Sequence, residues 1–222
     1  FSEGDTPCVV DVAGIKVGIT ICEDIWYKEP AHAARRVGAE LLINLNASPF
    51  HRGKHKERWR VLADRATEQS IPMIYVNQVG GQDELVFDGG SFAVNADGEL
   101  AMVAPDFEEG CFDLSVERTV RGIEIAQGVA ATALSDVAAV WQALVLGVRD
   151  YVEKNGFPGV VLGLSGGIDS AVTLAVAVDA LGADRVQAVM MPFKYTADMS
   201  VEDAGEQASI LGVEYDVISI EP

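Results

Sequence analysis

The sequence predicts an α/β protein, and three observations support this fold class. Of the 222 residues, 49% are hydrophobic and 22 are glycine, a composition typical of a folded globular protein. Apolar runs of strand length alternate with segments of helical pattern along the chain. In the C-terminal half, the glycine turn GLSGGIDS at 163–170 stands between an apolar strand and a helix, as at the strand ends of parallel sheets.

The N-terminal half is predicted to form strands covered by helices. The turn Ala13-Gly14 separates the first two strands, and a hairpin over 90–100 turns at Asp97-Gly98. The long continuous apolar strands indicate a sheet buried on both faces. The expected strands are 9–14, 15–21, 40–47 and 73–80, and the expected helices are 31–39 and 53–70.

The C-terminal half is predicted to be the βαβαβ opening of a doubly wound parallel sheet. A long helix over 135–156 begins at Ser135 or Asp136 as N-cap and ends at Gly156. The stretch 124–136 shows no strand pattern, so we place a linker at 118–133 between domains at 1–117 and 134–222. Strands are expected at 159–164, 186–192 and 214–220, and helices at 170–182 and 200–212.

Composition restricts the environment and the partners. A net charge of −18 argues against nucleic-acid and anionic-membrane partners, and no apolar run has the length of a membrane span. The spacing of Cys8, Cys22 and Cys111 fits neither a disulfide framework nor a zinc site, so we expect a cytoplasmic protein. Cys8 and Cys111 lie in strand-like runs and are predicted to be core residues. Because the chain begins with Phe1, we expect it to be part of a longer protein.

The glycine turn is predicted to bind phosphate. Backbone N–H groups are free where a strand ends and a helix begins, and Gly166 and Gly167 permit positive φ. Ser165 and Ser170 add hydroxyl donors, whereas the carboxylate of Asp169 would repel phosphate unless Mg²⁺ lies between them. Neither GxxxxGK[ST] nor GxGxxG is present. The alternative is a glycine turn selected only for tight packing.

These residues resemble the SGGxDS loop of the ATP pyrophosphatase family. The resemblance implies cleavage of ATP between its α and β phosphates and adenylation of a substrate oxygen, with Asp169 as the magnesium ligand. It leaves the acceptor substrate open. The ATP-binding residues that it implies are Gly163, Leu164, Ser165, Gly166, Gly167, Ile168, Asp169 and Ser170.

Cys22 is a candidate nucleophile, because it follows an apolar strand directly in VGITICEDIWY. The alternative is a small buried hydrophobic residue. This stretch, together with LLINLNASPFHRGKHKER, resembles the carbon–nitrogen hydrolase (nitrilase) family in its glutamine-amidase form. The resemblance implies a Glu–Lys–Cys triad with Cys22 as nucleophile. The family's Glu and Lys precede the cysteine by more residues than are present here, and Lys16 lies inside the strand.

Ser48 and Lys54 match positions that hold the α-amino and α-carboxylate ends of glutamine in the glutamine-dependent NAD synthetases. The alternatives are that Ser48-Pro49 is only a turn and that the residues after it are only a solvated helix start. His51 and His55 are four residues apart, as in metal-binding helices, but the sequence offers no third ligand. We therefore expect both histidines to face solvent.

Taken together, the two halves of the sequence resemble one family, the glutamine-dependent NAD synthetases. They imply a C-terminal portion of a nitrilase-like α/β sandwich, followed by the start of a parallel Rossmann-like adenine nucleotide α-hydrolase domain. The implied reaction amidates deamido-NAD⁺ with ATP, Mg²⁺ and ammonia from glutamine. A homo-oligomer is expected at full length, and these 222 residues alone are expected to be inactive. The alternatives are another ATP pyrophosphatase amidotransferase and an inactive nucleotide-binding module.

Overall fold

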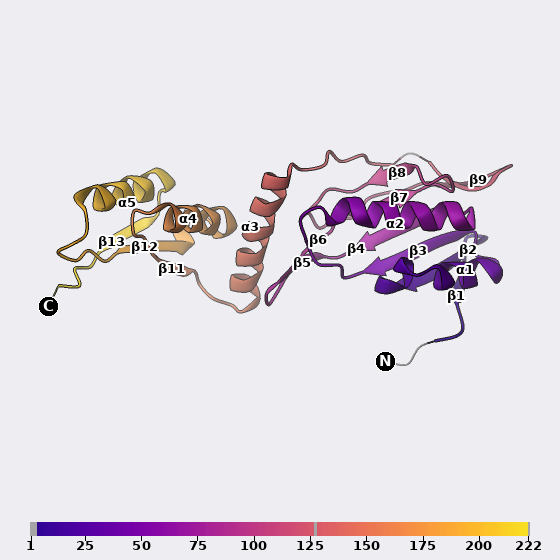
Figure 1. The fold of residues 1–222 in the computed structure, drawn as a ribbon, viewed down its shortest axis with the longest axis horizontal. Coiled ribbons are helices and arrows are strands. Elements are labelled where there is room, and N and C mark those ends of the chain that lie inside the picture. Colours follow the sequence, from indigo (N-terminus) through magenta and orange to yellow (C-terminus); the bar gives the residue numbers. More distant parts are fainter. Residues whose placement is uncertain (1–3, 127, 222) are drawn as a thin grey trace. The chain divides into compact units, whose positions relative to one another are not determined.

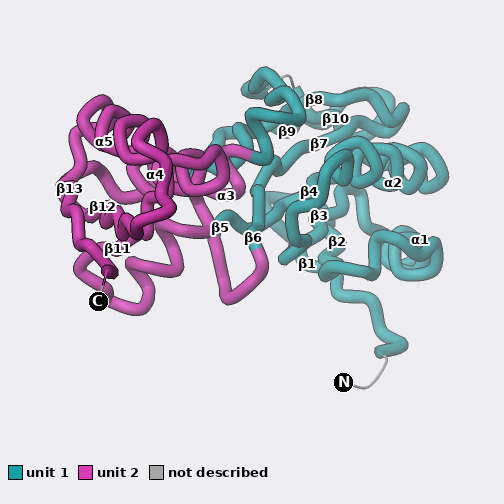
Figure 2. Tube along the Cα trace, turned by 60° about the vertical axis from the view of Figure 1, so that its left-hand side comes forward, with its two compact units in different colours: residues 1–80, 86–140 teal, residues 81–85, 141–222 magenta. Residues whose placement is uncertain are grey.

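A computed structural model describes residues 4–126 and 128–221. The chain divides into two compact units, coloured separately in Figure 2. The first contains residues 1–80 and 86–140, and the second contains residues 81–85 and 141–222. Each unit has a sheet of its own and is described by itself.

The first unit is built on a six-stranded sheet with the order β1-β2-β3-β4-β7-β8 (Figure 1). The central strands β2, β3 and β4 are parallel, with Ile21 opposite Leu45 and Asn46 opposite Asn77. Their carboxyl ends therefore meet at one edge of the sheet. The strands are β1 (Cys8–Val12), β2 (Ile15–Ile21), β3 (Leu41–Asn46), β4 (Met73–Asn77), β7 (Phe92–Val94) and β8 (Leu100–Val103).

Helices α1 (Lys28–Arg36) and α2 (Lys54–Gln69) pack on one face of this sheet. Leu62 and Ala66 of α2 are fully buried there, together with Met73 of β4. A 3₁₀ turn, η1 (Cys22–Trp26), connects β2 to α1. On the opposite face, a row of three neighbouring apolar residues keeps much of its surface exposed: Ile21 (63%), Leu45 (45%) and Val76 (40%).

Two hairpins complete the first unit, β5 (Val79–Gln82) with β6 (Leu85–Asp88) and β9 (Val116–Thr119) with β10 (Gly122–Ile125). The tip of the first hairpin, residues 81–85, groups with the second unit. β10 reaches into the stretch 124–136, where no strand was expected. Burial of Ile125 and its main-chain hydrogen bonds with Asn95 hold it in place.

Two cysteine predictions are wrong, because both Cys8 and Cys111 are exposed. Cys8 does lie in a strand, but β1 is the first strand of the sheet order and pairs only with β2. Cys111 lies outside the strands altogether. An apolar sequence run therefore did not distinguish an edge strand or a loop from the core.

The second unit confirms the predicted βαβαβ order. β11 (Val160–Gly163), β12 (Val186–Met190) and β13 (Glu214–Val217) form a parallel sheet in that order. Helices α4 (Ile168–Leu181) and α5 (Asp198–Leu211) connect them, with the short 3₁₀ turn η2 (Ala183–Arg185) before β12. One core cluster joins this sheet to α3, α4 and α5.

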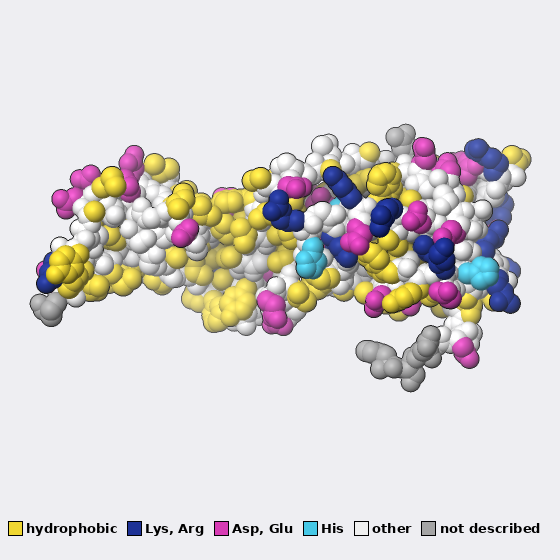
Figure 3. All heavy atoms as spheres, viewed as in Figure 1, with side chains coloured by type: hydrophobic (Ala, Val, Ile, Leu, Met, Phe, Trp, Pro, Cys, Tyr) yellow, Lys and Arg dark blue, Asp and Glu magenta, His cyan; other side chains and the backbone are white. Residues whose placement is uncertain are grey.

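Helix α3 (Asp136–Lys154) confirms the long helix predicted before the second sheet. The hydroxyl of Ser135 accepts a hydrogen bond from the N–H of Ala138 at 3.3 Å, as an N-cap does. Gly156 follows the helix with φ of 70°, the left-handed conformation that commonly ends helices. Hydrophobic side chains gather over α3 in Figure 3. The exposed hydrophobic residues of this helix are Val137, Leu144 and Tyr151.

The surface agrees with the acidic composition. On the face drawn in Figure 3, Lys and Arg side chains are interspersed with acidic ones and form no continuous basic surface. Within residues 4–126 and 128–221, no helix is both long enough and apolar enough to cross a membrane.

Candidate functional site

Cys22 lies at the carboxyl end of β2, as predicted, and begins the η1 turn. Its φ is 51°, a left-handed conformation that costs energy for any residue except glycine. Asp24 supports the turn by accepting a hydrogen bond from the N–H of Ile21 at 2.9 Å. The side chain of Cys22 is exposed, so the alternative of a buried hydrophobic residue is wrong.

A buried asparagine holds the Cys22 turn from the neighbouring strand. Asn44 of β3 is 0% exposed, and its Nδ2 lies 3.0 Å from the Thr20 hydroxyl and 3.5 Å from the Cys22 carbonyl oxygen. Asn46 donates to the side-chain oxygen of Asn44 at 2.6 Å. Buried polar groups need such partners. The hydrogen bonds of these two side-chain amides therefore fix the carboxyl ends of β2 and β3, next to Cys22.

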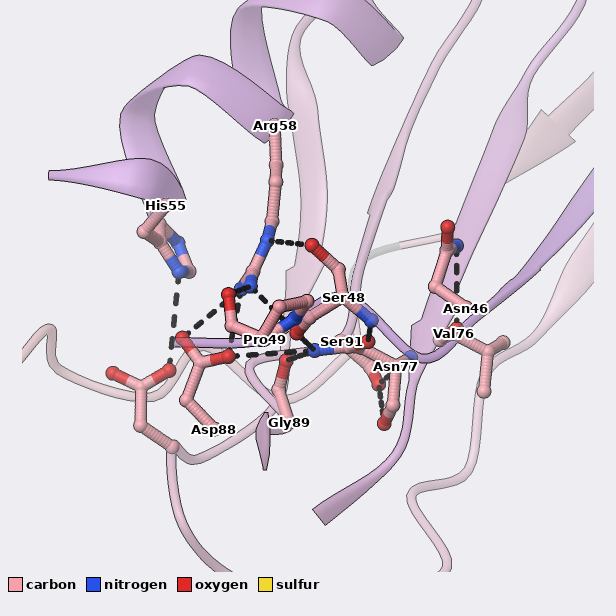
Figure 4. Close-up of polar contacts among 11 residues, drawn as sticks. Asn46, Ser48, Pro49, His55, Arg58, Val76, Asn77, Asp88, Gly89 and Ser91 are labelled. Carbon is pink, nitrogen blue, oxygen red and sulfur yellow. Dashed lines mark hydrogen bonds and ion pairs between the residues drawn. The ribbon is translucent and has the colours of Figure 1, made fainter. Parts of the chain in front are cut away.

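Ser48, three residues beyond Leu45 of β3, is held by a buried arginine (Figure 4). Arg58 of α2 is 1% exposed and donates from Nε to the Ser48 hydroxyl at 3.1 Å. Its Nη2 donates to the carbonyl oxygens of Ser48 at 2.9 Å and Pro49 at 3.0 Å. Its Nη1 lies 2.8 and 2.9 Å from the two carboxylate oxygens of Asp88.

Asn77, at the end of β4, completes the support of Ser48. Its side-chain oxygen accepts from the N–H of Ser48 at 2.8 Å, and its Nδ2 donates to the Ser48 carbonyl at 3.2 Å. The same Nδ2 lies 3.1 Å from the carbonyl of Gly89, and the N–H of Asn77 donates to Ser91 at 3.0 Å. Main-chain and side-chain groups of Ser48 are therefore fixed from two separate segments, α2 and β4.

Tyr75 lies near both Cys22 and Ser48. It is 1% exposed and stacks on Phe92 with ring centroids 5.1 Å apart. Burial raises the pKa of Tyr75, whereas the Ser48 hydroxyl and Arg58 lower it and Cys22 raises it further. Its hydroxyl makes no hydrogen bond of ordinary geometry with the described residues.

Lys54, the first residue of α2, contacts the turn that carries Cys22. Its Nζ lies 4.4 Å from the ring centroid of Trp26, the last residue of η1, and 3.1 Å from the carboxylate of Glu57. The structure thus brings Lys54 to the Cys22 turn. Lys16 is elsewhere, because it lies near the start of β2 and its Nζ is close to Gly38.

The two histidines differ from one another. His51 is exposed, as expected, but His55 is half-buried, with its ring 6.0 Å from that of Phe92 and its Nδ1 3.8 Å from Asp106. The prediction that both face solvent is wrong for His55, since it lies on the side of α2 that meets the sheet. Burial raises the pKa of Asp106, and His55 opposes this shift. The described residues include no cluster of three or more His, Cys, Asp or Glu side chains suited to a metal ion.

The glycine bend follows β11 and leads directly into α4. Gly166 has φ of 76°, whereas Gly167 has φ of −92°, so only one glycine needs a left-handed conformation. A Cβ on Gly166 would lie 2.2 Å from the carbonyl oxygen of Ser200 in the first turn of α5. This close approach requires glycine independently of any ligand, and the tight-packing interpretation therefore explains part of the motif.

The hydroxyls of the bend bond to one another and to main-chain groups of the bend. Ser165 Oγ and Ser170 Oγ lie 3.0 Å apart, and Ser165 Oγ accepts from the N–H of Gly167 at 3.3 Å. Asp169 is exposed in the first turn of α4, while the side chain of Leu164 is 1% exposed in the core. Leu164 can therefore offer a ligand only its main chain, whereas Asp169 and Ser165 are accessible.

Sequence reasoning missed Asn44, Arg58, Tyr75, Asn77 and Asp88, the residues that hold the Cys22 region together. One signal was available for Arg58, because it shares the buried face of α2 with Leu62 and Ala66 at four-residue spacing. An arginine on an apolar stripe predicts a buried partner. The other four residues sit in strand patterns that carry no such signal.

This fold and site define a carbon–nitrogen hydrolase of the nitrilase type. Residues 1–122 match the carbon–nitrogen hydrolase family model, and the chain belongs to that family. Residues 140–222 match the NAD synthase family model. The chain thus joins the two kinds of domain that its sequence predicted.

The relatives that match nearly the whole chain are glutamine-dependent NAD(+) synthetases. The chain is 46% identical to a glutamine-dependent NAD(+) synthetase of Acinetobacter baylyi, over 100% of this chain and 41% of that relative. It is 48% identical to one of Xylella fastidiosa, over 97% and 39%. The chain therefore spans about 40% of the length of these relatives.

A solved structure agrees closely. The glutamine-dependent NAD+ synthetase of Acinetobacter baumannii, in complex with adenosine diphosphate, superimposes with a TM-score of 0.93 at 46% identity, covering 100% of this chain and 42% of that one. The synthetase of Cytophaga hutchinsonii has a TM-score of 0.75 at 19% identity, covering 97% and 40%. The second comparison shows that the fold is retained when most residues differ.

Proposed function

We propose that this chain carries the thiol and ATP sites of a glutamine-dependent NAD⁺ synthetase. The observation that carries the proposal is the presence, on one chain, of an exposed Cys22 at the end of a parallel strand and an exposed Asp169 in a glycine bend. Similarity to the synthetases over the whole chain supports it. Glutamine supplies nitrogen at the first site, and ATP activates the carboxylate of deamido-NAD⁺ at the second.

At the first site, the thiolate of Cys22 attacks the side-chain amide carbon of glutamine, and ammonia leaves. Ser48 and Lys54 bind the α-amino and α-carboxylate groups of glutamine. Both residues are near the Cys22 region, Lys54 through Trp26 and Ser48 through Tyr75. Of the family's Glu–Lys–Cys triad, only the cysteine has a counterpart in these 222 residues, so we expect no glutamine hydrolysis from them alone.

At the second site, the bend from Gly163 to Ser170 binds the phosphates of ATP, and the positive end of α4 favours their charge. The structure of the A. baumannii relative with adenosine diphosphate supports nucleotide binding by this domain. The donor set fits Mg²⁺, because Asp169 offers an exposed carboxylate beside two serine hydroxyls and Mg²⁺ prefers oxygen ligands. When bound, Mg²⁺ neutralises phosphate charge during transfer of the adenylyl group.

The acidic surface supports small-molecule substrates over nucleic acid, and we place the protein in the cytoplasm, without a membrane partner and as a homo-oligomer at full length. The best-supported rival is another ATP pyrophosphatase amidotransferase. It shares both sites and differs in the acceptor. NAD⁺ formation from deamido-NAD⁺, compared with amidation of other carboxylates, distinguishes the two.

The test uses the natural full-length product and two nitrogen donors. Cys22→Ala is expected to reduce glutamine-driven NAD⁺ formation by at least about a thousandfold, while ammonium chloride still drives the reaction. Cys8→Ala is the matched control, since that cysteine is also exposed but lies on an edge strand. If Cys22→Ala retains glutamine-driven turnover, or if neither donor yields NAD⁺ with the unaltered protein, the proposal is wrong.

A further inference from the structure

Each of the three nitrogen atoms of the Arg58 guanidinium group donates a hydrogen bond. A guanidinium group carries five N–H groups in a rigid plane. In this structure Nε donates to the Ser48 hydroxyl, Nη2 donates to the carbonyl oxygens of Ser48 and Pro49, and Nη1 donates to the carboxylate of Asp88. Figure 4 shows Arg58 reaching from its helix to these groups. A buried residue that only balanced the charge of Asp88 would need fewer of these contacts.

The contact to the hydroxyl fixes how Ser48 can meet a ligand. Arg58 can only donate, so the oxygen of Ser48 accepts from Nε and one of its lone pairs is occupied. The second lone pair of this oxygen then remains available to a hydrogen-bond donor. The backbone of Ser48 is held at the same time by Arg58 and Asn77, so the hydroxyl cannot move to satisfy a different geometry.

The environment of this hydroxyl is the Cys22 region. Ile21, the residue before Cys22, pairs with Leu45 of β3, and Ser48 follows two residues after the end of that strand.

We propose that Arg58 is a positioning residue for glutamine: by donating to one lone pair of the Ser48 hydroxyl, it fixes the other lone pair to accept from the α-amino group of the bound amino acid beside Cys22. This inference rests on the proposed function, because it assumes that Ser48 contacts glutamine. Arg58 itself does not touch the substrate. Its effect is to orient one hydrogen bond, which should change the KM for glutamine more than kcat.

The experiment compares Arg58→Lys with the unaltered natural full-length product. Lysine keeps the charge opposite Asp88 but lacks the planar set of donors. We expect the KM for glutamine to rise roughly ten- to hundredfold, as for loss of a charged hydrogen bond, with kcat at saturating glutamine and the ammonia-driven rate each within about twofold. Arg65→Lys is the matched control, since Arg65 lies on the same helix and pairs with Glu68 away from Ser48.

A double-mutant cycle with Ser48→Ala separates positioning from general stability. If Arg58 acts through Ser48, the double variant has the same KM as the worse single variant. Additive effects, an unchanged KM in Arg58→Lys, or an equal KM increase in Arg65→Lys would overturn the proposal. If Arg58→Lys unfolds below the assay temperature, Asp88→Asn provides the test instead. It removes the charge that pairs with Nη1 of Arg58 and leaves Arg58 itself in place. A raised KM for glutamine then supports the proposal, and an unchanged KM overturns it.

Failure of the proposed function looks different from failure of this inference. If the unaltered protein forms no NAD⁺ with either nitrogen donor, the function itself is wrong. If it uses both donors, and Arg58→Lys also uses both with unchanged KM, only the role of Arg58 is wrong.

Discussion

The two sites of this chain are held together in opposite ways. Around Ser48, the hydrogen bonds join residues 10 to 30 positions apart in the sequence and include a buried arginine. In the glycine bend, the hydrogen bonds of Ser165 and Ser170 join residues two to five positions apart and lie at the surface. The first site is therefore a product of tertiary packing, and the second is largely encoded by one local motif.

This difference predicts how each site responds to substitution. A change at the Ser48 site should be felt through long-range partners, whereas most changes at the bend should affect only the bend. One contact breaks this rule, namely the approach of Gly166 to the main chain of Ser200. It is the place where the local motif depends on the wider fold.

Gly166→Ala is expected to have the largest effect at the bend. The new Cβ would lie 2.2 Å from the Ser200 carbonyl oxygen, and the residue has φ of 76°. The positive φ alone costs about 1–2 kcal/mol, and the clash adds to it by displacing either the bend or α5. We expect a lower melting temperature and at least about tenfold weaker binding of adenosine diphosphate by calorimetry.

Gly156→Ala is the matched control for that variant. Gly156 has φ of 70° and a Cβ there would have nothing within 4 Å, so only the backbone cost applies. Nucleotide binding should remain unchanged in this control. If the two variants lose the same stability and bind nucleotide equally, the contact with Ser200 has no importance for the bend.

Asp169→Asn is expected to have the next largest effect, and only in the presence of Mg²⁺. The amide keeps the size of the side chain but removes the charge that attracts the ion. Nucleotide affinity in Mg²⁺ should fall at least about tenfold, towards the value measured in a chelator. Asp184→Asn, another exposed carboxylate of the same unit, should bind as the unaltered protein does. Equal Mg²⁺ dependence in Asp169→Asn and the unaltered protein would exclude Asp169 as a ligand.

The contrast between the two sites also explains which features could be predicted. The strand order of the second unit and the positions of Cys22 and Asp169 follow from apolar periodicity and from residues next to strand ends. Arg58 and Asp88 could not be paired in this way, because their contact depends on how α2 lies on the sheet. The sequence likewise placed Cys8 and Cys111 in the core, since apolar patterns reveal neither which strand forms the edge nor which run is a loop.

The exposed row of Ile21, Leu45 and Val76 sharpens the comparison further, because it lies on the same strand ends as the thiol site. An apolar row of this kind favours association. We expect these 222 residues to associate at rising concentration, and Leu45→Gln to weaken that association in sedimentation velocity. Leu100→Gln is the control, because Leu100 is similarly exposed, at 46%, but lies on β8, the last strand of the sheet order. Identical sedimentation of all three proteins would show that the row does not mediate contact.

The smallest expected effect concerns an exposed ion pair that belongs to neither site. Arg118 on β9 contacts Glu40 beside β3, and this hydrogen bond, followed by one from the N–H of Lys16, lowers the pKa of Glu40 from 4.5 to about 2. Because the folded pKa is the lower one, the stabilisation is complete above pH 4.5 and is lost as the pH falls towards 2. Arg118→Gln should therefore lower the midpoint of urea unfolding slightly at pH 7, and the difference from the unaltered chain should narrow between pH 4.5 and pH 2. Since the pair is exposed, salt should reduce this difference. A difference that stays constant with pH and salt would mean that Arg118 acts by packing, and that ion pairing contributes nothing measurable at this surface.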